Sequence, residues 1–167
     1  MTKNNTNYLI QGVSLNYPES ALHVLLKERA AFSKSAIALQ FGKEFVTYGE
    51  LQIRINQTAN YLSAKGVRPG HIVAISLDRS PDLIVSLFAI LQCGAAYLPI
   101  DITYPDSRIA FMIADSEAEF FINTTSKQEV SHSATTIFIE DILKVEKNLS
   151  IEPISLQVSA KSNAYII

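Results

Sequence analysis

The sequence predicts an α/β protein with a mostly parallel sheet, and three observations lead to this fold class. Short apolar segments alternate along the chain with longer segments whose apolar residues recur at helical spacing. One short segment, 72–77 (IVAISL), is uncharged and does not alternate between polar and apolar residues, which is typical of a strand covered on both faces. The links between segments are short, as in parallel sheets with right-handed crossovers.

The N-terminal region is expected to contain an arm and a first helix. Residues 1–19 form the predicted arm, and 20–167 form the predicted folded unit. Ser20 is in position to cap the first helix, because its hydroxyl can accept a hydrogen bond from a free backbone N–H. The apolar residues of this helix fall on one stripe, made of Leu22, Leu25, Leu26 and Ala30.

A hairpin and a long helix are predicted next. Strands at 36–41 and 44–48 flank Gly42-Lys43, a dipeptide that favours a two-residue turn. Residues 47–50 (TYGE) have the spacing of a capping box, in which the first and last residues bond to each other's backbone N–H groups. The helix that begins there is expected to end at Gly66 and to bury a face made of Leu51, Ile55, Ala59 and Leu62.

An uncharged stretch, 83–100, is long enough to span a bilayer, but its own signals favour a helix and a strand. Residues 80–82 (SPD) combine a capping hydroxyl, a proline at the first helical position and an acid in the first turn. Gly94 is placed to end this helix, and 95–100 then reads as a strand. Because the helix is apolar almost all round, we expect it to be deeply buried, with no membrane-spanning segment.

Three more elements are predicted in the last third of the chain. Segments 119–123 and 135–140 are expected to be strands, whereas 124–134 and 144–162 are polar and expected to be irregular. A helix beginning at Pro105 is expected to face the core with Ile109, Met112 and Ile113.

The composition excludes several function classes. Apolar residues make up 48% and charged residues 18%, which is a globular composition. A net charge of -2 and a pI near 5.9 give no electrostatic basis for binding nucleic acid or an anionic membrane. Cys93 is the only cysteine and the polar N-terminus has no apolar segment, so a cytoplasmic protein is expected.

The sequence shows no recognisable catalytic or metal-binding pattern. Neither of the glycine motifs that cradle phosphates, G-x-x-x-x-G-K-[ST] and G-x-G-x-x-G, occurs in it. His23, His71 and His132 lie far apart, so they are interpreted as surface or loop histidines and not as metal ligands. Cys93 lies in an apolar segment without a neighbouring cation, which favours a buried, inert thiol over a nucleophile.

Three charged residues are candidates for a binding site. Asp78 and Arg79 follow one predicted strand and Asp101 follows another, at the carboxyl ends where α/β folds bind ligands. For Asp101 we favour the alternative that its side chain ties down the loop beyond Pro99. The residues therefore leave two interpretations open, a binding or structural module, or an active site formed by polypeptide outside this sequence.

Three stretches together resemble the adenylate-forming enzymes. VTYGEL (46–51) is similar to the first signature of that family and LQCGAAYLPID (91–101) to the second. TYPDSRIAFMIADS (103–116) is similar to the amino-acid-activating branch, the adenylation domains of nonribosomal peptide synthetases. The resemblance covers about 20–125 well and the rest more loosely. It implies the N-terminal part of an adenylation domain, with a mostly parallel, Rossmann-like sheet flanked by helices.

The last six residues, SNAYII (162–167), are expected to begin a strand. Most of them are apolar or β-prone, and no turn or cap follows. In the family that the chain resembles, AYII leads into a loop rich in Gly, Ser and Thr that holds the phosphates of ATP. The resemblance therefore implies a sequence that is interrupted inside this strand, just before the phosphate-binding loop.

The resemblance implies an activity for a complete enzyme. The carboxylate of an amino acid attacks the α-phosphate of Mg-ATP, which gives an aminoacyl adenylate and pyrophosphate. The aminoacyl group then passes to the phosphopantetheine thiol of a carrier protein. The family's phosphate-contacting groups lie in later motifs that match no position here. No catalytic, cofactor-binding or metal-binding residue is therefore assigned, and the chain alone is expected to be inactive and to bind ATP and Mg weakly.

Two alternative functions stay open. The chain could be a non-catalytic module that self-associates through an exposed sheet edge or complements the remainder of an adenylation domain. It could also be the front of an acyl-CoA ligase, since those enzymes share the fold. In each case the matched motifs are expected to be structural, so Gly94→Val should lower stability without altering binding.

Overall fold

The computed structural model describes residues 19–125 and 132–167 and confirms the α/β class. The predicted arm therefore lies, except for Glu19, outside the described residues. The helices are α1 (Leu22–Phe32), α2 (Tyr48–Ala64), α3 (Pro81–Gln92), α4 (Asp106–Asp115), α5 (Ile139–Val145) and the short 3₁₀ helix η1 (Glu146–Asn148). The strands are β1 (Ile37–Phe41), β2 (Glu44–Thr47), β3 (Ile72–Ile75), β4 (Ala96–Pro99), β5 (Phe120–Asn123) and β6 (Thr135–Phe138).

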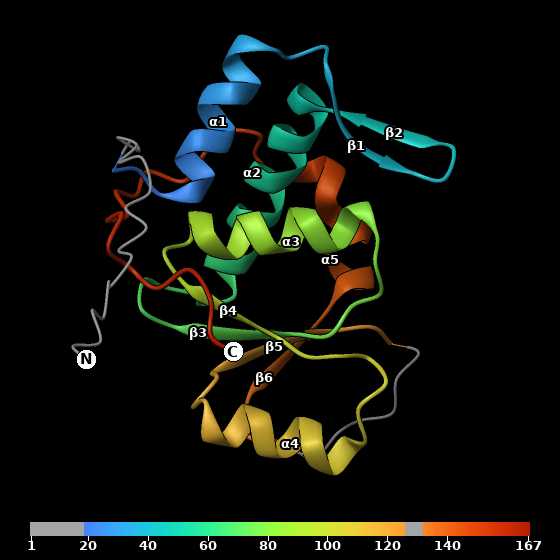
Figure 1. Ribbon diagram of the computed structural model, residues 1–167, viewed down its shortest axis with the longest axis vertical. Helices are drawn as coiled ribbons and strands as arrows, with labels where there is room; N and C mark the ends of the chain where they lie inside the picture. The colour runs from blue at the N-terminus through green and yellow to red at the C-terminus, as the bar shows by residue number, and fades with distance from the viewer. Residues whose placement is uncertain (1–18, 126–131) are drawn as a thin grey trace, which may run out of the picture.

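The main sheet is parallel, as predicted, with strand order β4-β3-β5-β6. Figure 1 shows α2, α3 and α5 on one face of this sheet and α4 on the other. Val73 and Ile75 of β3 point into a core shared with α2 and α3, whereas Ala74 between them packs on the α4 side. All three are buried, because both faces of the strand are covered.

The first helix begins one residue later than predicted. Ala21 occupies the N-cap position and has no oxygen on its side chain, so the expected cap by Ser20 is wrong. The backbone N–H groups of Val24 and Leu25 instead donate to the carbonyl of Ala21, at 3.0 and 3.2 Å. Ala30 of the predicted stripe is buried, and the leucines of the stripe are partly or mostly exposed.

The hairpin and the second helix follow the predicted local rules. β1 and β2 pair antiparallel, and Gly42 at the turn has a φ of 60°. The capping box is complete, since the N–H of Glu50 donates to Thr47 Oγ1 at 3.2 Å and the N–H of Thr47 donates to Glu50 Oε2 at 2.9 Å. Gly66, with φ 103°, follows the end of α2 and leaves the helix in the left-handed conformation.

The uncharged stretch 83–100 divides into α3 and β4, as predicted. Ser80 Oγ accepts a hydrogen bond from the N–H of Leu83 at 3.2 Å, and Gly94 ends the helix with a φ of 73°. In the two described stretches, no helix is both long and apolar enough to cross a bilayer. The expected deep burial of α3 is wrong for one face, where four large side chains are only partly buried: Leu83, Ile84, Leu87 and Phe88.

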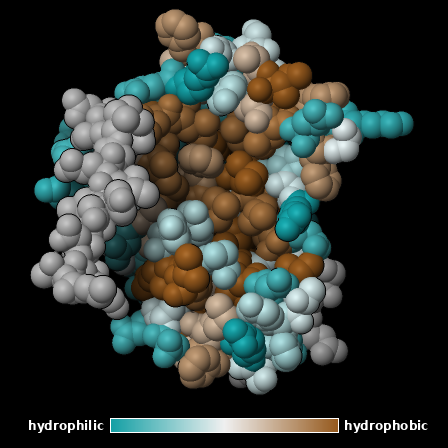
Figure 2. Space-filling view, viewed as in Figure 1, coloured by the Kyte–Doolittle hydropathy of each residue, from teal (hydrophilic) through white to brown (hydrophobic). Residues whose placement is uncertain are grey.

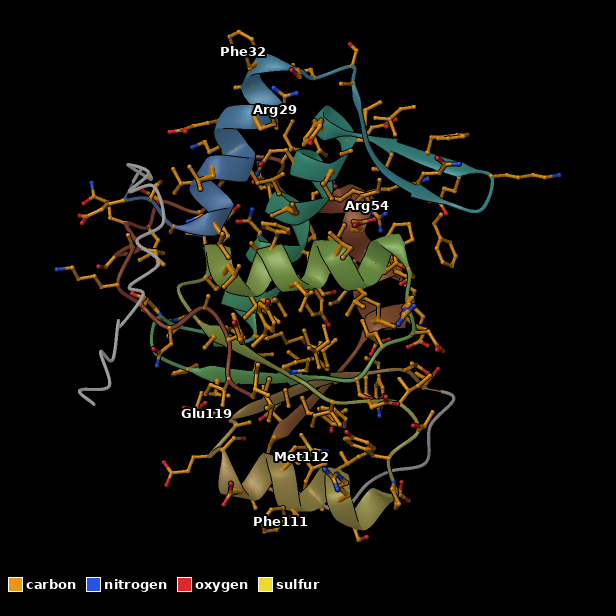
Figure 3. The ribbon with its side chains drawn as sticks, in the orientation of Figure 1. Arg29, Phe32, Arg54, Phe111, Met112 and Glu119 are labelled. Carbon is orange, nitrogen blue, oxygen red and sulfur yellow. The ribbon has the colours of Figure 1, made fainter. Side chains whose placement is uncertain are left out.

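Helix α4 confirms the predicted inward face. Ile109 and Ile113 are buried against the sheet, and Met112 packs beside them. In Figure 3, Met112 points toward the sheet and Phe111 points away from it. The charged and polar residues of α4 therefore face solvent, as its periodicity indicates.

The predicted strand at 135–140 is two residues too long. β6 ends at Phe138, and α5 and η1 occupy a region that was expected to be part strand and part irregular. Ile139 and Ile142 are three residues apart and are both buried against the α3 side of the sheet, which favours a helix there. Burial in the tertiary structure outweighs the β-propensity of the segment.

Residues 149–163, which we call the strap, contain no helix or strand and lead to the predicted final strand. The N–H of Tyr97 donates to the carbonyl of Ala164 at 3.1 Å, and the N–H of Ile166 donates to the carbonyl of Tyr97 at 3.0 Å. Tyr165 thus lies parallel to Tyr97, beside β4. The run 164–166 extends the sheet by one short pairing at this edge.

Candidate functional site

The structure brings the three predicted site residues together at the carboxyl edge of the sheet. Asp78 and Arg79 follow β3, and Asp101 follows β4, the neighbouring parallel strand. They line one open hollow of about 600 Å³. The remaining lining residues are apolar: Phe41, Leu77, Ile100 and Ile102. The edge therefore combines an apolar surface with three charged side chains, at the place where parallel sheets bind ligands.

Asp101 has the structural role that the sequence favoured. The N–H and the hydroxyl of Thr103 donate to Asp101 Oδ1 at 2.8 and 2.7 Å. This side-chain to backbone bond closes the turn after β4 and fixes the direction of the loop toward α4. The carboxylate therefore shapes the rim of the hollow, and one of its oxygens is already engaged.

The charge of the hollow differs from that of a typical phosphate site. Among the described residues that line it are two carboxylates and one guanidinium, so the lining carries a net negative charge, which disfavours phosphate. The nearby N-terminus of α3 offers little compensation. Pro81 has no N–H, Ser80 already accepts the N–H of Leu83, and Asp82 places a negative charge in the first turn. The free N–H groups and the positive charge by which helix N-termini bind anions are therefore missing here, already bonded, or offset by a carboxylate of the same helix.

Arg54 joins three elements beside the site, a contact that the sequence did not reveal. Its Nη2 donates to Asp82 Oδ1 at 2.5 Å and its Nε donates to Glu146 Oε1 at 3.2 Å, so α2, α3 and η1 are linked. Figure 3 labels Arg54 on α2. Burial opposes the charge of Arg54, but its bonds to the two carboxylates outweigh burial and raise its pKa. Glu146 lies far from Arg54 in sequence, so spacing could not predict this pair.

The histidines lie apart, two of them in loops as predicted. His71 stacks on Phe120 with ring centroids 5.7 Å apart, and His132 meets the ring of Phe121 edge-on at 5.1 Å. His23 lies in α1, where burial, followed by the charge of Lys27, lowers its pKa. Within 19–125 and 132–167, no three or more metal-ligating side chains gather.

The interpretation of Cys93 as a buried thiol is confirmed. The residue is 1% exposed and its Sγ lies 3.5 Å from the carbonyl oxygen of Ala59, as a donor. Burial raises the pKa of Cys93 to about 12, and the charge of Arg68 only partly opposes this shift. A thiol that stays protonated at neutral pH is a poor nucleophile.

An apolar surface continues from the hollow toward the hairpin. A groove of about 370 Å³ lies between β1 and the start of α3, and it shares Phe41 and Arg79 with the hollow. Figure 2 shows an apolar face in the middle of this side of the molecule, where Figure 1 places α3. We call it the α3 face, made of Leu83, Ile84, Leu87 and Phe88 with the groove beside them. The sequence did not predict that this face is open.

These features define a scaffold class, a parallel α/β unit with a shaped carboxyl edge and an uncovered apolar face. The family model of the AMP-binding enzymes matches residues 26–166 of the chain. The chain therefore belongs to the AMP-binding enzyme family, and it corresponds to the N-terminal part of an adenylation domain. The expectation from the three signature stretches is confirmed.

Curated relatives are nonribosomal peptide synthetases of much greater length. Bacitracin synthase 1 from Bacillus licheniformis is 35% identical over 170 aligned residues, which cover 100% of this chain and 3% of that protein. The chain spans 2–3% of the length of the curated relatives it matches first. The likeness therefore concerns one segment of each synthetase.

Solved structures share the fold. The AMPPNP-bound form of the nonribosomal peptide synthetase FmoA3 has a TM-score of 0.82 at 23% identity, over 92% of this chain and 17% of that one. An artificially fused adenylation–PCP di-domain from Klebsiella oxytoca, NpsA-ThdA, has a TM-score of 0.80 at 23% identity, over 88% of this chain and 28% of that one. Both structures contain a sheet and helices arranged as in this chain.

Proposed function

We propose that the chain supplies the front of an amino-acid-activating adenylation domain. The complete enzyme joins an amino acid to ATP, releases pyrophosphate, and transfers the aminoacyl group from AMP to the thiol of a carrier protein. The observation that carries this proposal is the family match over 26–166. The three signature stretches within it form the cap of α2, the α3–β4 corner, and α4.

We further propose that this chain builds scaffold and that other polypeptide grips the nucleotide. The lining of the hollow at Asp78, Arg79 and Asp101 has a net negative charge, and the sequence has no phosphate-cradling glycine motif. ATP and Mg would therefore bind the complete enzyme, and this chain alone would be inactive. No residue of this chain is given a catalytic role.

The partner proposed for the α3 face is the remainder of the adenylation domain. Four partly buried apolar side chains on one helix are an uncommon surface for a monomer and indicate a contact. A second proposed partner is a carrier protein with a phosphopantetheine arm, which the adenylation–PCP fusion NpsA-ThdA supports. The proposed unit is 20–167, preceded by the arm.

An exchange assay tests the proposed function. Residues 1–167 would replace the matching part of an adenylation domain from the bacitracin synthase relative, and ATP–pyrophosphate exchange would be measured with the common amino acids. We expect amino-acid-dependent exchange from this chimera and background exchange from the chain alone. A folded chimera without exchange would contradict the activity, and exchange by the isolated chain would contradict the proposed division of labour.

A second candidate function is a non-catalytic interaction module. The observation that favours it is the β4 edge, which among residues 19–125 and 132–167 is paired only with the short run 164–166 and lies on the same molecule as the open α3 face. Such a module would self-associate. Size-exclusion chromatography with light scattering distinguishes the two candidate functions. The interaction module would self-associate, whereas the scaffold proposal expects a monomer once the remainder of the domain is supplied.

A further inference from the structure

The run 164–166 is held to the sheet by few contacts of its own, one of which is the packing of Ile166 on the core of the α4 side. Two backbone hydrogen bonds join it to Tyr97, and the ring of Tyr165 stacks on that of Tyr97 with centroids 5.8 Å apart. Tyr165 is still 53% exposed. A short edge pairing of this kind is marginal in water without support from elsewhere.

Support comes from the other end of the strap, through amide side chains of α2. Asn56 Nδ2 donates to the carbonyl of Ile151 at 2.6 Å. Asn60 Nδ2 donates to the carbonyls of Ser150 and Glu152 at 3.1 and 2.9 Å. Gln57 Nε2 lies 3.4 Å from the carbonyl of Leu149. We call these three α2 side chains, Asn56, Gln57 and Asn60, the amide latch.

The latch reaches from the core to the surface, because two of its residues are buried and Asn60 is half-buried. Asn56 and Gln57 are 6% and 7% exposed. Asn56 Oδ1 also accepts from Gln52 and Gln92, at 2.8 and 3.2 Å, so the latch is oriented by a second helix. Buried amides that lose their partners are costly, which makes the strap and the latch mutually dependent.

Beyond the latch, apolar side chains keep the strap close to the fold. Ile154 packs on the main core, and Leu156 Cδ2 lies 3.3 Å from the position that a Cβ on Gly94 would take. The strap then reaches Ala164, where pairing with β4 begins. Tyr165 lies opposite Tyr97 in a parallel pairing, so the chain there runs in the direction of β4, toward the carboxyl edge of the sheet.

From this path we infer that the amide latch sets the register of the run 164–166 on β4. It thereby decides which chain segment stands at the carboxyl edge of the sheet. The latch donates its hydrogen bonds to backbone carbonyls. It therefore fixes the position of the strap backbone and makes no use of the strap side chains. Asn60 is the positioning residue of this device because it holds two strap carbonyls at once. The inference concerns how the fold is assembled and does not rest on the proposed function.

The test is amide hydrogen exchange in the full chain carrying Asn60→Asp. Aspartate has nearly the same volume but, when ionised, cannot donate a hydrogen bond. Losing two bonds to the strap should speed exchange of the Tyr97 and Ile166 amides about tenfold. The amide of Ser76, which donates to Ile122 in the middle of the sheet, should be unchanged.

Gln157→Glu is the matched control, since it makes the same amide-to-acid change on an exposed strap residue. It should leave all three amides unaffected. If Asn60→Asp does not fold, Gln57→Glu keeps the comparison measurable, because it removes only the longest latch contact. Unchanged exchange at Tyr97 and Ile166, or an equal rise at Ser76, would overturn the inference.

Discussion

Different forces hold the helix pair α2–α3 and the strap. Facing side chains of α2 and α3 are buried and apolar, such as Leu62 and Ala89, so solvent exclusion stabilises the pair. The strap is mostly exposed and has no regular structure, and amide side chains of α2 hold its backbone. The comparison teaches that one helix, α2, serves two purposes, with an apolar stripe for the core and an adjacent polar stripe for the strap.

Gly94→Val should give the largest effect, because Gly94 lies where the two regions meet. A Cβ there would be 3.2 Å from two atoms of Pro69 and 3.3 Å from Leu156 of the strap, and φ is 73°. We expect a loss of about 2–4 kcal/mol in the free energy of unfolding, measured by urea denaturation.

Gly42→Val is its control. Gly42 has a φ of 60°, and a Cβ there meets no described atom within 4 Å, so only backbone strain is added. The difference between the two variants measures the crowding between core and strap. Equal losses would show that Leu156 and Pro69 simply move aside.

The thiol of Cys93 reports whether the strap stays closed. Cys93 and six strap residues line one groove: Ser150, Glu152, Pro153, Ile154, Ser155 and Leu156. Burial raises its pKa from 9.0 to about 12, so the unfolded chain loses this proton first as the pH rises. Stability should therefore be unaffected below about pH 9 and should fall by about 1.4 kcal/mol for each further unit up to about pH 12.

Urea denaturation of wild type and Cys93→Ala at pH 7 to 10 checks this prediction. The loss attributed to Cys93 is the part that the variant lacks. If the two proteins keep a constant difference in stability across this range, water reaches the thiol without unfolding. The strap would then fail to keep water from the thiol. The strap and the α2–α3 pair would differ more in how well they exclude water than their contacts indicate.

Glu50→Gln should have the smallest effect on stability. It changes only the N-terminal cap of α2 and does not involve the strap. The bond from the backbone N–H of Thr47, and then that from its hydroxyl, lower the pKa of Glu50 below its ordinary value of 4.5. The carboxylate therefore contributes stability above that value, and the contribution is lost as the pH falls through the lowered pKa.

Glutamine can still accept the Thr47 bond but does not titrate, so the variant should lack this acid sensitivity. Thermal unfolding midpoints of both proteins between pH 2 and 7 would be compared. A gap that persists at the lowest pH would indicate that the substitution changes packing and not charge.

Local rules account for the elements that the sequence predicted correctly. The capping box at Thr47, the Ser80 cap and the turn at Gly94 each depend on residues within a few positions. Asp78, Arg79 and Asp101 could also be placed together, because the carboxyl ends of parallel strands share one edge. Their role in binding stays a prediction.

The features that the sequence missed depend on distant partners. Asn56 and Asn60 look like ordinary polar residues of a helix surface until the strap, more than 85 positions later, is placed on them. Arg54 likewise meets Glu146 only in the folded chain. Helix α5 was missed because its short sequence is β-prone and its burial is decided by the sheet. Phe41 joins the hollow only through the placement of the hairpin.

The strand order has a consequence for synthesis. β3 lies inside the sheet but is the earliest of its strands in the sequence, and its partners β4 and β5 both follow it. At about 5–20 residues per second, the roughly 50 residues that lead to β5 take a few seconds to emerge from the ribosome. Both edges of this uncharged strand are unpaired until β4 emerges, and one edge stays unpaired until β5 emerges, so the newly made chain is most prone to wrong pairing in that interval.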